Sequence, residues 1–385
     1  MMHMLAQLHD PIVNWFKNHP SPPVAIISDM FLGWTHDLAC KLGIQRIVFS
    51  PSGAMALSTM YYLWRYMPIP NDPNDPNATV SLSTMPNSPT YPWWQISPLY
   101  RGFVEEGPNM EFVKDGFLGN ISSWGLVINS FTDLEGLYLD HLMKELGHER
   151  VWAVGPLLPT PDNDSSGLIE RGGSSAVSVD DILYWLDTCE ELKVVYVCFG
   201  SQAVLTNDQM KELALGLETS GVHFIWSIKE PTKGQVEGQY GMFPSGFEER
   251  VAGRGLVIKG WAPQVLILRH RAVGAFLTHC GWNSTLEGLV SGVRFLAWPM
   301  GADQFVDTAL LVDELRVAIR VCEGAKTVPN SHKLAIALAE SVSDNGVDER
   351  ERAMGLRGAA LEAIKEGGSS VKALDGLVKR LTELG

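Results

Sequence analysis

The fold is indicated most clearly by residues 255–299, which read GLVIKGWAPQVLILRHRAVGAFLTHCGWNSTLEGLVSGVRFLAWP. Short apolar runs at 255–258, 274–278 and 294–298 are separated by stretches with helical spacing that begin near Pro263 and Ser284. Continuous apolar runs are typical of parallel strands that are buried on both faces. Strands that alternate with helices indicate βαβ units. This stretch therefore predicts a parallel sheet covered by helices.

The same alternation extends along the chain in both directions and predicts a second sheet. The expected elements before residue 155 are strands at 24–28, 46–49, 125–129 and 151–154, with helices at 30–42, 54–66, 109–118 and 136–146. Further strands at 194–199 and 223–228, and helices from about Thr206 and Asp303, belong with the stretch quoted above. We expect an α/β protein made of two doubly wound halves that face each other across a cleft.

Two segments interrupt this regularity. Residues 156–178 contain three prolines followed by Asn, Asp, Ser and Gly, which is linker composition. We therefore expect a first domain at 1–155, a linker at 156–178, a second domain at 179–369 and a C-terminal helix at 370–385 that returns to the first domain. Residues 68–98 are rich in Pro, Asn and Ser and predict an extended surface loop. Its aromatic residues, Tyr91, Trp93 and Trp94, either are buried for structural reasons or wall a pocket.

Composition and charge exclude several classes of protein. The chain has 385 residues with 30 Lys and Arg against 44 Asp and Glu, a formal net charge of −14, which disfavours nucleic acid as a partner. No uncharged apolar run approaches the ~18 residues that a membrane-spanning helix needs. The five cysteines are widely spaced without a Cys-x-x-Cys pair, which favours a reducing compartment. We expect a globular, cytoplasmic protein, taken as a monomer, with no integral membrane segment.

One strand end carries residues suited to binding phosphate. The strand at 274–278 leads through His279 into Gly281, and Asn283 and Ser284 open a helix. Free backbone N–H groups and the helix dipole attract an anion at such a terminus. His279 beside it could donate to a phosphate oxygen. The alternative is that Ser284 and Glu287, three residues apart, form a capping box with a purely structural role.

Other strand ends carry residues suited to a base and to a sugar. Trp261 follows the strand at 255–258, and it is either a cap on the core or a flat platform for a base. Asp303 and Gln304 follow the strand at 294–298, and a carboxylate beside an amide can hold vicinal hydroxyls, although Asp303 could equally be an N-cap. Ser201 offers a hydroxyl at a glycine turn.

The segment from Trp261 to Gln304 resembles the signature box of plant family 1 UDP-glycosyltransferases. Residues 195–201, 128–131 and 366–370 resemble the same family, and the details are most similar to the branch that acts on flavonols and related phenolics. The resemblance implies a GT-B-like pair of Rossmann-like domains. It also implies inverting transfer of glucose from UDP-glucose to a hydroxyl of a small aromatic acceptor such as a flavonol, with no metal and no further cofactor.

The resemblance also implies a role for each residue of the box. Trp261 would stack on uracil, the backbone of Ala262 would pair with the uracil edge, and Gln264 and Glu287 would reach the ribose. The diphosphate would be held by Ser201, His279, Asn283 and Ser284 at the Gly281 turn, and the sugar by Trp282, Asp303 and Gln304. A final Gln, here Gln304, goes with glucose. Arg294 stands where the family usually has proline, which puts the local turn in question.

The catalytic half departs from the family. The family's base is a histidine in a Gly-His turn after the first strand, polarised by an aspartate, and Asp29 matches that aspartate. None of the ten histidines stands in such a turn, although His36 is a candidate substitute. The resemblance therefore implies an N-terminally truncated member whose incomplete first domain lacks roughly three βα units, about a hundred residues.

Three functions are left to compare. The first is a glucosyltransferase, and the second is a truncated UDP-sugar-binding homologue with little or no activity. The third, a nicotinamide dehydrogenase, lacks a G-x-G-x-x-G turn after a strand. Five residues are candidates for the acceptor pocket, although core packing explains such residues more often: Met55, Tyr61, Trp64, Tyr91 and Trp94.

Overall fold

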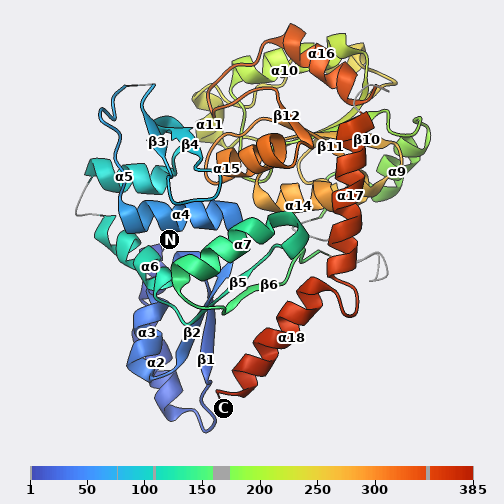
Figure 1. Ribbon diagram of the computed structural model, residues 1–385. Helices are drawn as coiled ribbons and strands as arrows, with labels where there is room; N and C mark the ends of the chain where they lie inside the picture. The colour runs from blue at the N-terminus through green and yellow to red at the C-terminus, as the bar shows by residue number, and fades with distance from the viewer. Residues whose placement is uncertain (1, 76, 107–109, 159–173, 344–346, 385) are drawn as a thin grey trace. The chain divides into compact units, whose positions relative to one another are not determined.

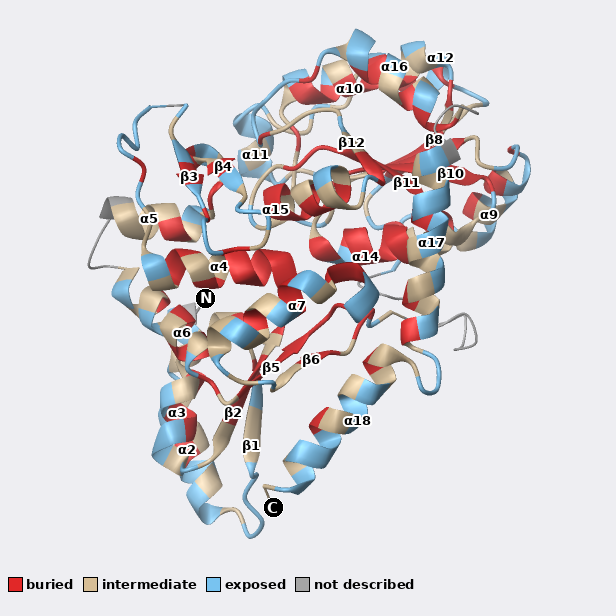
Figure 2. Ribbon diagram, in the orientation of Figure 1, coloured by how far each residue is buried: buried red, intermediate tan, exposed pale blue. Residues whose placement is uncertain are grey.

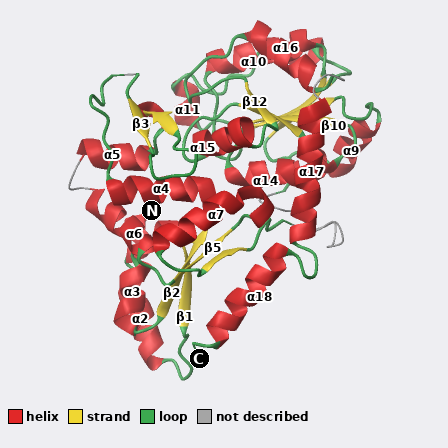
Figure 3. Ribbon diagram, viewed as in Figure 1, coloured by secondary structure: helices red, strands yellow, loops and turns green. Residues whose placement is uncertain are grey.

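The computed structural model describes residues 2–75, 77–106, 110–158, 174–343 and 347–384. Contacts divide the chain into two units (Figure 1), of which unit 1 comprises residues 1–157 and 359–385 and unit 2 comprises residues 158–358. Each unit is built on a parallel sheet of its own (Figure 3). The predicted α/β class with two parallel Rossmann-like sheets is therefore confirmed. The expected linker at 156–178 falls mostly on residues 159–173, outside the described residues.

Unit 1 contains a four-stranded parallel sheet of order β1-β2-β5-β6. Its strands are β1 (Ala25–Asp29), β2 (Gln45–Ser50), β5 (Gly125–Ile128) and β6 (Val151–Ala153). The helices after the strands are α3 (Thr35–Leu42), α4 (Ala54–Tyr66) and α7 (Thr132–Leu146), with α6 (Glu111–Ile121) packed on α3 and α4. Two helices precede β1, α1 (Met2–Ala6) and α2 (His9–Asn18), and α5 (Pro98–Glu106) precedes α6.

The C-terminal helix α18 (Ser369–Thr382) packs on the sheet of unit 1. Its Leu377 is buried in an apolar cluster with Ile47, Val127 and Trp152. The Ser370 hydroxyl donates a hydrogen bond to the carbonyl of Gly155. The last residues of the chain are therefore part of the same core as its first strands.

The expected loop at 68–98 contains a hairpin. Strands β3 (Thr79–Ser81) and β4 (Thr90–Pro92) pair in antiparallel fashion, which corrects the expectation that this segment is an extended surface loop without strands. The hairpin forms because it buries apolar side chains, with Tyr91 and Trp93 only 5% and 4% exposed. The rings of Trp93 and Tyr100 pack edge to face, with 6.2 Å between the ring centroids. The structural interpretation therefore holds for Tyr91 and Trp93, whereas Trp94 is exposed.

Unit 2 contains a six-stranded parallel sheet of order β12-β11-β10-β7-β8-β9. The strands are β7 (Val194–Cys198), β8 (His223–Ile228), β9 (Gly255–Lys259), β10 (Val273–Thr278), β11 (Arg294–Ala297) and β12 (Ala318–Arg320). Five of them correspond to predicted strands, whereas β12 was not predicted. The helices include α9 (Val179–Asp187), α10 (Asn207–Ser220), α13 (Gln264–Arg269), α14 (Trp282–Ser291), α15 (Gln304–Ala309), α16 (Ser331–Ser341) and α17 (Val347–Ala363), the last of which extends into unit 1.

The central strands of unit 2 are buried on both faces (Figure 2). β7 and β10 have Val, Ala, Phe and Leu side chains with almost no exposed area, which is the environment expected for a parallel sheet between helix layers. Strands fixed in this way hold the turns after their carboxyl ends in place. In doubly wound sheets ligands bind at that edge, and the candidate site lies there.

Candidate functional site

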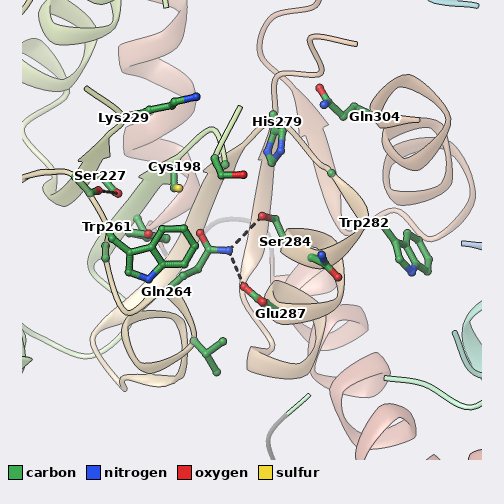
Figure 4. Close-up of a pocket in the computed structure, with 18 of the residues that line it drawn as sticks. Cys198, Ser227, Lys229, Trp261, Gln264, His279, Trp282, Ser284, Glu287 and Gln304 are labelled. Carbon is green, nitrogen blue, oxygen red and sulfur yellow. Dashed lines mark hydrogen bonds between the residues drawn. The ribbon is translucent and has the colours of Figure 1, made fainter. Parts of the chain in front are cut away.

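A cavity of about 630 Å³ lies at the carboxyl ends of the strands of unit 2 (Figure 4). Its walls come from the turns after β7, β8, β9, β10 and β11. Every residue of the signature box that was expected to bind the donor lines it, as does Ser201: Trp261, Ala262, Gln264, His279, Gly281, Trp282, Asn283, Ser284, Glu287, Asp303 and Gln304. The structure thus brings together residues that are up to 103 positions apart, from Ser201 to Gln304.

Trp261 forms one rim of the cavity. It follows Gly260, whose φ of +122° is a conformation that favours glycine. The Gly260 N–H donates to the Ile228 carbonyl at 2.8 Å, and the Trp261 carbonyl accepts from the Ala176 N–H at 2.8 Å. The Trp261 side chain is 36% exposed, so it lies at the rim of the cavity and is not buried in the core. Pro263 is the N-cap of α13, in agreement with the expectation that a helix begins near Pro263.

Gln264, Ser284 and Glu287 form a polar bridge between α13 and α14. Gln264 Nε2 donates to Glu287 Oε2 at 2.6 Å and to Ser284 Oγ at 3.2 Å, as the dashed lines of Figure 4 mark. The N-cap of α14 is Gly281, so the alternative of a Ser284–Glu287 capping box is wrong. Ser284 and Glu287 are instead held at the cavity, 6% and 7% exposed. Together these three side chains present fixed oxygens and an amide to a ligand.

The N-terminus of α14 opens into the cavity. Gly281, Trp282, Asn283 and Ser284 all line it, and they form the N-cap and the first turn. The first N–H groups of a helix have no partner within the helix, and the dipole adds about half a positive charge there. This end of α14 therefore has the geometry to bind a phosphate group.

His279 stands between two glycines beside that terminus. A Cβ on Gly200 would lie 2.6 Å from His279 Nε2, and a Cβ on Gly281 would lie 2.8 Å from the same atom. The Nδ1 atom lies 3.3 Å from the Thr278 hydroxyl. Burial lowers the pKa of His279 to about 4, because a buried imidazole resists taking up charge. The ring is therefore neutral near pH 7.

Of the residues expected to hold a sugar, Asp303 and Gln304 follow β11, whereas Trp282 begins α14 after β10. Gln304 Oε1 accepts from the N–H groups of Met300 and Gly301 at 2.8 and 3.0 Å, which leaves the Nε2 donors for a ligand. Asp303 is the N-cap of α15, but its side chain makes no capping hydrogen bond. Trp282 is 4% exposed. The indole of Trp282 is therefore mostly buried within the cavity wall.

Asp29 lies in unit 1, at the carboxyl end of β1. Its Oδ1 accepts the Phe31 N–H at 2.8 Å and begins a short 3₁₀ helix, η1 (Met30–Leu32). His36 lies on α3, with Nδ1 3.5 Å from the Ser123 hydroxyl and Nε2 3.8 Å from the Cys40 sulfur. Burial, and then the charge of Arg46, lower the pKa of His36.

Three candidate acceptor residues are core residues of α4. Met55, Tyr61 and Trp64 are 2%, 4% and 1% exposed, and Trp64 stacks on Phe117. Tyr61 is so deeply buried that its pKa is raised. Core packing therefore explains these three residues.

Arg294 begins β11 where the family usually has proline. It is 9% exposed, and its Nη1 donates to the carbonyls of Glu340 and Ser341, both at 3.1 Å, at the C-terminus of α16. Its Nη2 lies 3.7 Å from Glu349. The guanidinium thus satisfies the last carbonyls of a helix, which is a favourable place for a cation. The expected disturbance at this turn is confined to a structural contact outside the cavity lining.

Sequence reasoning missed several residues of the cavity wall. Those that carry polar side chains are Tyr196, Cys198, Ser227, Lys229 and Glu230. They lie on β7 and β8 or directly after β8. The rule that ligands bind after the carboxyl ends of the strands also applied to residues 227–230, and it was the signal that could have found them.

Several general features of the described residues accompany the site. All five cysteines are free. Within the described ranges, no group of three or more His, Cys, Asp or Glu side chains is placed to hold a metal ion. No helix in that part of the chain combines the length and the apolar character needed to cross a bilayer.

Comparison with known sequences gives a consistent picture. The family model described as "UDP-glucoronosyl and UDP-glucosyl transferase" matches residues 179–355. UDP-glycosyltransferase 89B2 of Stevia rebaudiana is 56% identical over 382 residues, which cover 99% of this chain and 80% of the relative. Flavonol 3-O-glucosyltransferase UGT89B1 of Arabidopsis thaliana is 53% identical over 385 residues, which cover 100% of this chain and 79% of the relative.

Comparison with solved structures shows a likeness in fold over 99% of this chain. Arabidopsis thaliana UGT89C1, solved in complex with UDP-L-rhamnose, superposes with a TM-score of 0.77 at 41% identity, covering 99% of this chain and 78% of that one. The same protein solved with quercetin gives a TM-score of 0.74 at 40% identity, with the same coverage. These likenesses confirm the GT-B-like class that the resemblance implied.

Proposed function

The chain belongs to the UDP-glycosyltransferase family, and from this premise we propose that it transfers glucose from UDP-glucose to a hydroxyl of a small aromatic acceptor such as a flavonol. The anomeric configuration is inverted in this reaction. The donor binds in the cavity of unit 2.

The arrangement of the cavity carries the proposal for the donor. Trp261, exposed at the rim, offers a face for uracil, and base stacking on an aromatic ring contributes about 1–3 kcal/mol. Glu287 and Gln264, bonded to each other at 2.6 Å, offer the oxygen and amide that a ribose needs. The first turn of α14 and the neutral His279 donate to the diphosphate. These three parts follow one another along a single cavity, in the order of the parts of a UDP-sugar.

Glucose is the sugar we propose, and Gln304 supports it. Its carbonyl oxygen is occupied by the turn at Met300 and Gly301, so its amide N–H groups face a ligand as donors. Asp303 beside it supplies an acceptor for sugar hydroxyls. The name of the Arabidopsis relative at 53% identity specifies glucosyl transfer to flavonols, whereas UGT89C1 at 41% was solved with UDP-L-rhamnose. UDP-rhamnose is therefore the competing donor in any test.

The transfer step requires stabilisation of the departing diphosphate. The acceptor oxygen forms a bond to C1 of glucose while the bond from C1 to the phosphate oxygen breaks, and UDP leaves. Negative charge grows on the phosphate oxygens, where the N–H groups of α14 and His279 donate. Loss of one preorganised donor of this kind costs about 3 kcal/mol in the barrier. The proton of the acceptor hydroxyl passes to a base. We propose that Asp29, which matches the aspartate that polarises the family's base, takes part in this proton transfer.

A second candidate function is UDP-sugar binding with little or no turnover. Two observations favour it. None of the ten histidines follows a strand in a Gly-His turn, and the ring nitrogens of His36 face Ser123 and Cys40. Loss of a positioned base costs about 10²- to 10⁴-fold in rate. The donor cavity is the same under both functions.

Calorimetric titration with UDP-glucose and an assay with quercetin in the same preparation separate the two functions. Saturable binding with glucoside formed above the level of His279→Ala supports the transferase. Binding without product supports the binding protein. If UDP-glucose does not bind to folded protein, both are wrong.

A further inference from the structure

The donor cavity holds little positive charge from side chains. Its lining includes three carboxylates, Glu230, Glu287 and Asp303, and a single ammonium group, Lys229. His279 adds no charge near pH 7, because burial lowers its pKa to about 4. A UDP-sugar carries negative charge on both phosphates. Apart from the partial charge of the α14 terminus, Lys229 is thus the one cationic group among the described residues that line this cavity.

Lys229 is placed beside the turn that was expected to bind phosphate. It directly follows β8, which pairs with β7, and β7 in turn pairs with β10. Its Nζ lies 3.4 Å from the carbonyl of Gln202, in the turn Gly200–Gln202 that follows β7. His279, which follows β10, approaches the same turn from the other side, with Nε2 2.6 Å from the Cβ position of Gly200. The turn is therefore bracketed by His279 and Lys229.

The ammonium group of Lys229 has N–H donors available for a ligand. An ammonium group offers three N–H donors, and the contact with Gln202 is the one hydrogen bond of Nζ recorded within the described residues, at a long 3.4 Å. In Figure 4 the Lys229 side chain extends along the cavity toward the side where His279 lies. A structural ion pair would direct the group elsewhere, as it does for Lys259, whose Nζ lies 2.8 Å from Glu248.

We propose that Lys229 is a donor-binding residue that pairs with the diphosphate of the UDP-sugar across the Gly200–Gln202 turn. The proposal rests on the proposed binding of a UDP-sugar in this cavity. It assigns the neutralisation of the diphosphate charge to a residue outside the signature box. Ser201, in the turn itself, then donates from its hydroxyl to the same phosphates.

The test compares UDP with uridine, because the two ligands share the base and ribose and differ in the phosphates. We expect Lys229→Gln to weaken UDP about tenfold, in line with a hydrogen bond to a charged group, and to change uridine binding less than about twofold. Lys229→Arg keeps the charge and is expected to stay within about threefold of the wild type for UDP. Lys259→Gln, on the neighbouring strand end, is the matched control and should leave both affinities unchanged.

The outcomes separate this proposal from the donor-binding proposal. If the wild type binds UDP and Lys229→Gln binds it equally well, or loses uridine to the same extent as UDP, the role of Lys229 is wrong while the donor site stands. If the folded wild type binds neither UDP nor UDP-glucose, the donor site itself is wrong. Added salt should weaken UDP binding to the wild type more than to Lys229→Gln, because screening acts on the pair that the variant lacks.

Discussion

His279 Nε2 occupies the space that a Cβ on Gly200 would need, at 2.6 Å. The turn after β7 and the turn after β10 therefore approach each other as closely as they do because residue 200 has no side chain. Gly200 also has a φ of +74°, which favours glycine. The position of the imidazole, at the end of the cavity where we propose that phosphate binds, depends on this contact and on the similar contact with Gly281.

Gly200→Ala should displace His279 and weaken UDP-glucose binding at least tenfold, because a Cβ at 2.6 Å forces the ring or the turn to move. Gly221→Ala is the control. Gly221 has a similar φ of +72° but nothing within 4 Å of its Cβ position, so it carries only the backbone strain of about 1 kcal/mol. Calorimetry on both variants checks the prediction. Equal losses of affinity in the two variants would mean that the His279 contact is irrelevant.

The lowered pKa of His279 predicts a pH-dependent stability. Its folded pKa of about 4 lies below the usual 6.5, so protonation favours the unfolded chain. This contribution is fully present above pH 6.5 and is lost as the pH falls toward 4. Between pH 7 and pH 5 we expect His279→Asn to lose about 2 kcal/mol less of its free energy of unfolding than the wild type. Urea unfolding at the two pH values measures this, and parallel losses would contradict the assigned pKa.

The bond between Gln264 and Glu287 predicts a second pattern of ligand binding. Glu287→Ala removes an acceptor at the proposed ribose position, and we expect a loss of about 1.5–3 kcal/mol in binding free energy. UDP and uridine should weaken equally, since both contain the ribose. This differs from the pattern expected for Lys229→Gln. A loss confined to UDP would place Glu287 near the phosphates and would contradict the assignment.

The contact of Ala176 with Trp261 predicts that a residue before α9 supports the rim of the cavity. Ala176→Pro removes the N–H that donates to the Trp261 carbonyl at 2.8 Å. We expect the affinity for uridine to fall by a factor of about 5, which corresponds to the free energy of a typical hydrogen bond. Ala176→Ser keeps the N–H and should bind uridine normally. If both substitutions are silent, Trp261 is fixed by β8 and β9 without this segment.

Buried Arg46 predicts a stability effect in unit 1. It is 2% exposed, and its guanidinium donates to Ser28 Oγ, Asn120 Oδ1 and Ser123 Oγ at 2.8 to 3.0 Å. Arg46→Met leaves these buried oxygens without their donor and should lower the free energy of unfolding by about 3 kcal/mol. Arg380→Met removes an exposed arginine from the same unit, and its effect should stay within about 0.5 kcal/mol. Thermal unfolding of the two variants tests the difference.

The sequence predicted those parts of the fold that depend on continuous apolar runs. All strands of the two parallel sheets except β12 were found, because parallel strands buried between helices need such runs. β12 was missed because its three residues, Ala318–Arg320, are too short for a pattern to emerge. The hairpin at 79–92 was missed because its turn-forming composition outweighed two strands of three residues each.

In the candidate site too, some residues could be predicted from the sequence and others could not. Residues of one continuous motif, from Trp261 to Gln304, were identified together, and all of the predicted ones line the cavity. The capping-box alternative for Ser284 and Glu287 could not be settled from spacing, because their partner, Gln264, lies twenty positions before Ser284. Lys229 was missed because a single lysine after a strand has no pattern until β7 and β8 are placed side by side.

We propose that the cavity of unit 2 binds a UDP-sugar with its base stacked on Trp261. Calorimetric titration of the wild type and of Trp261→Ala with UDP-glucose tests it most directly. We expect saturable binding by the wild type and a loss of about tenfold in the variant, since stacking contributes about 1–3 kcal/mol per base. Equal binding by both proteins, or no binding by a wild type whose circular dichroism shows a folded chain, would contradict it.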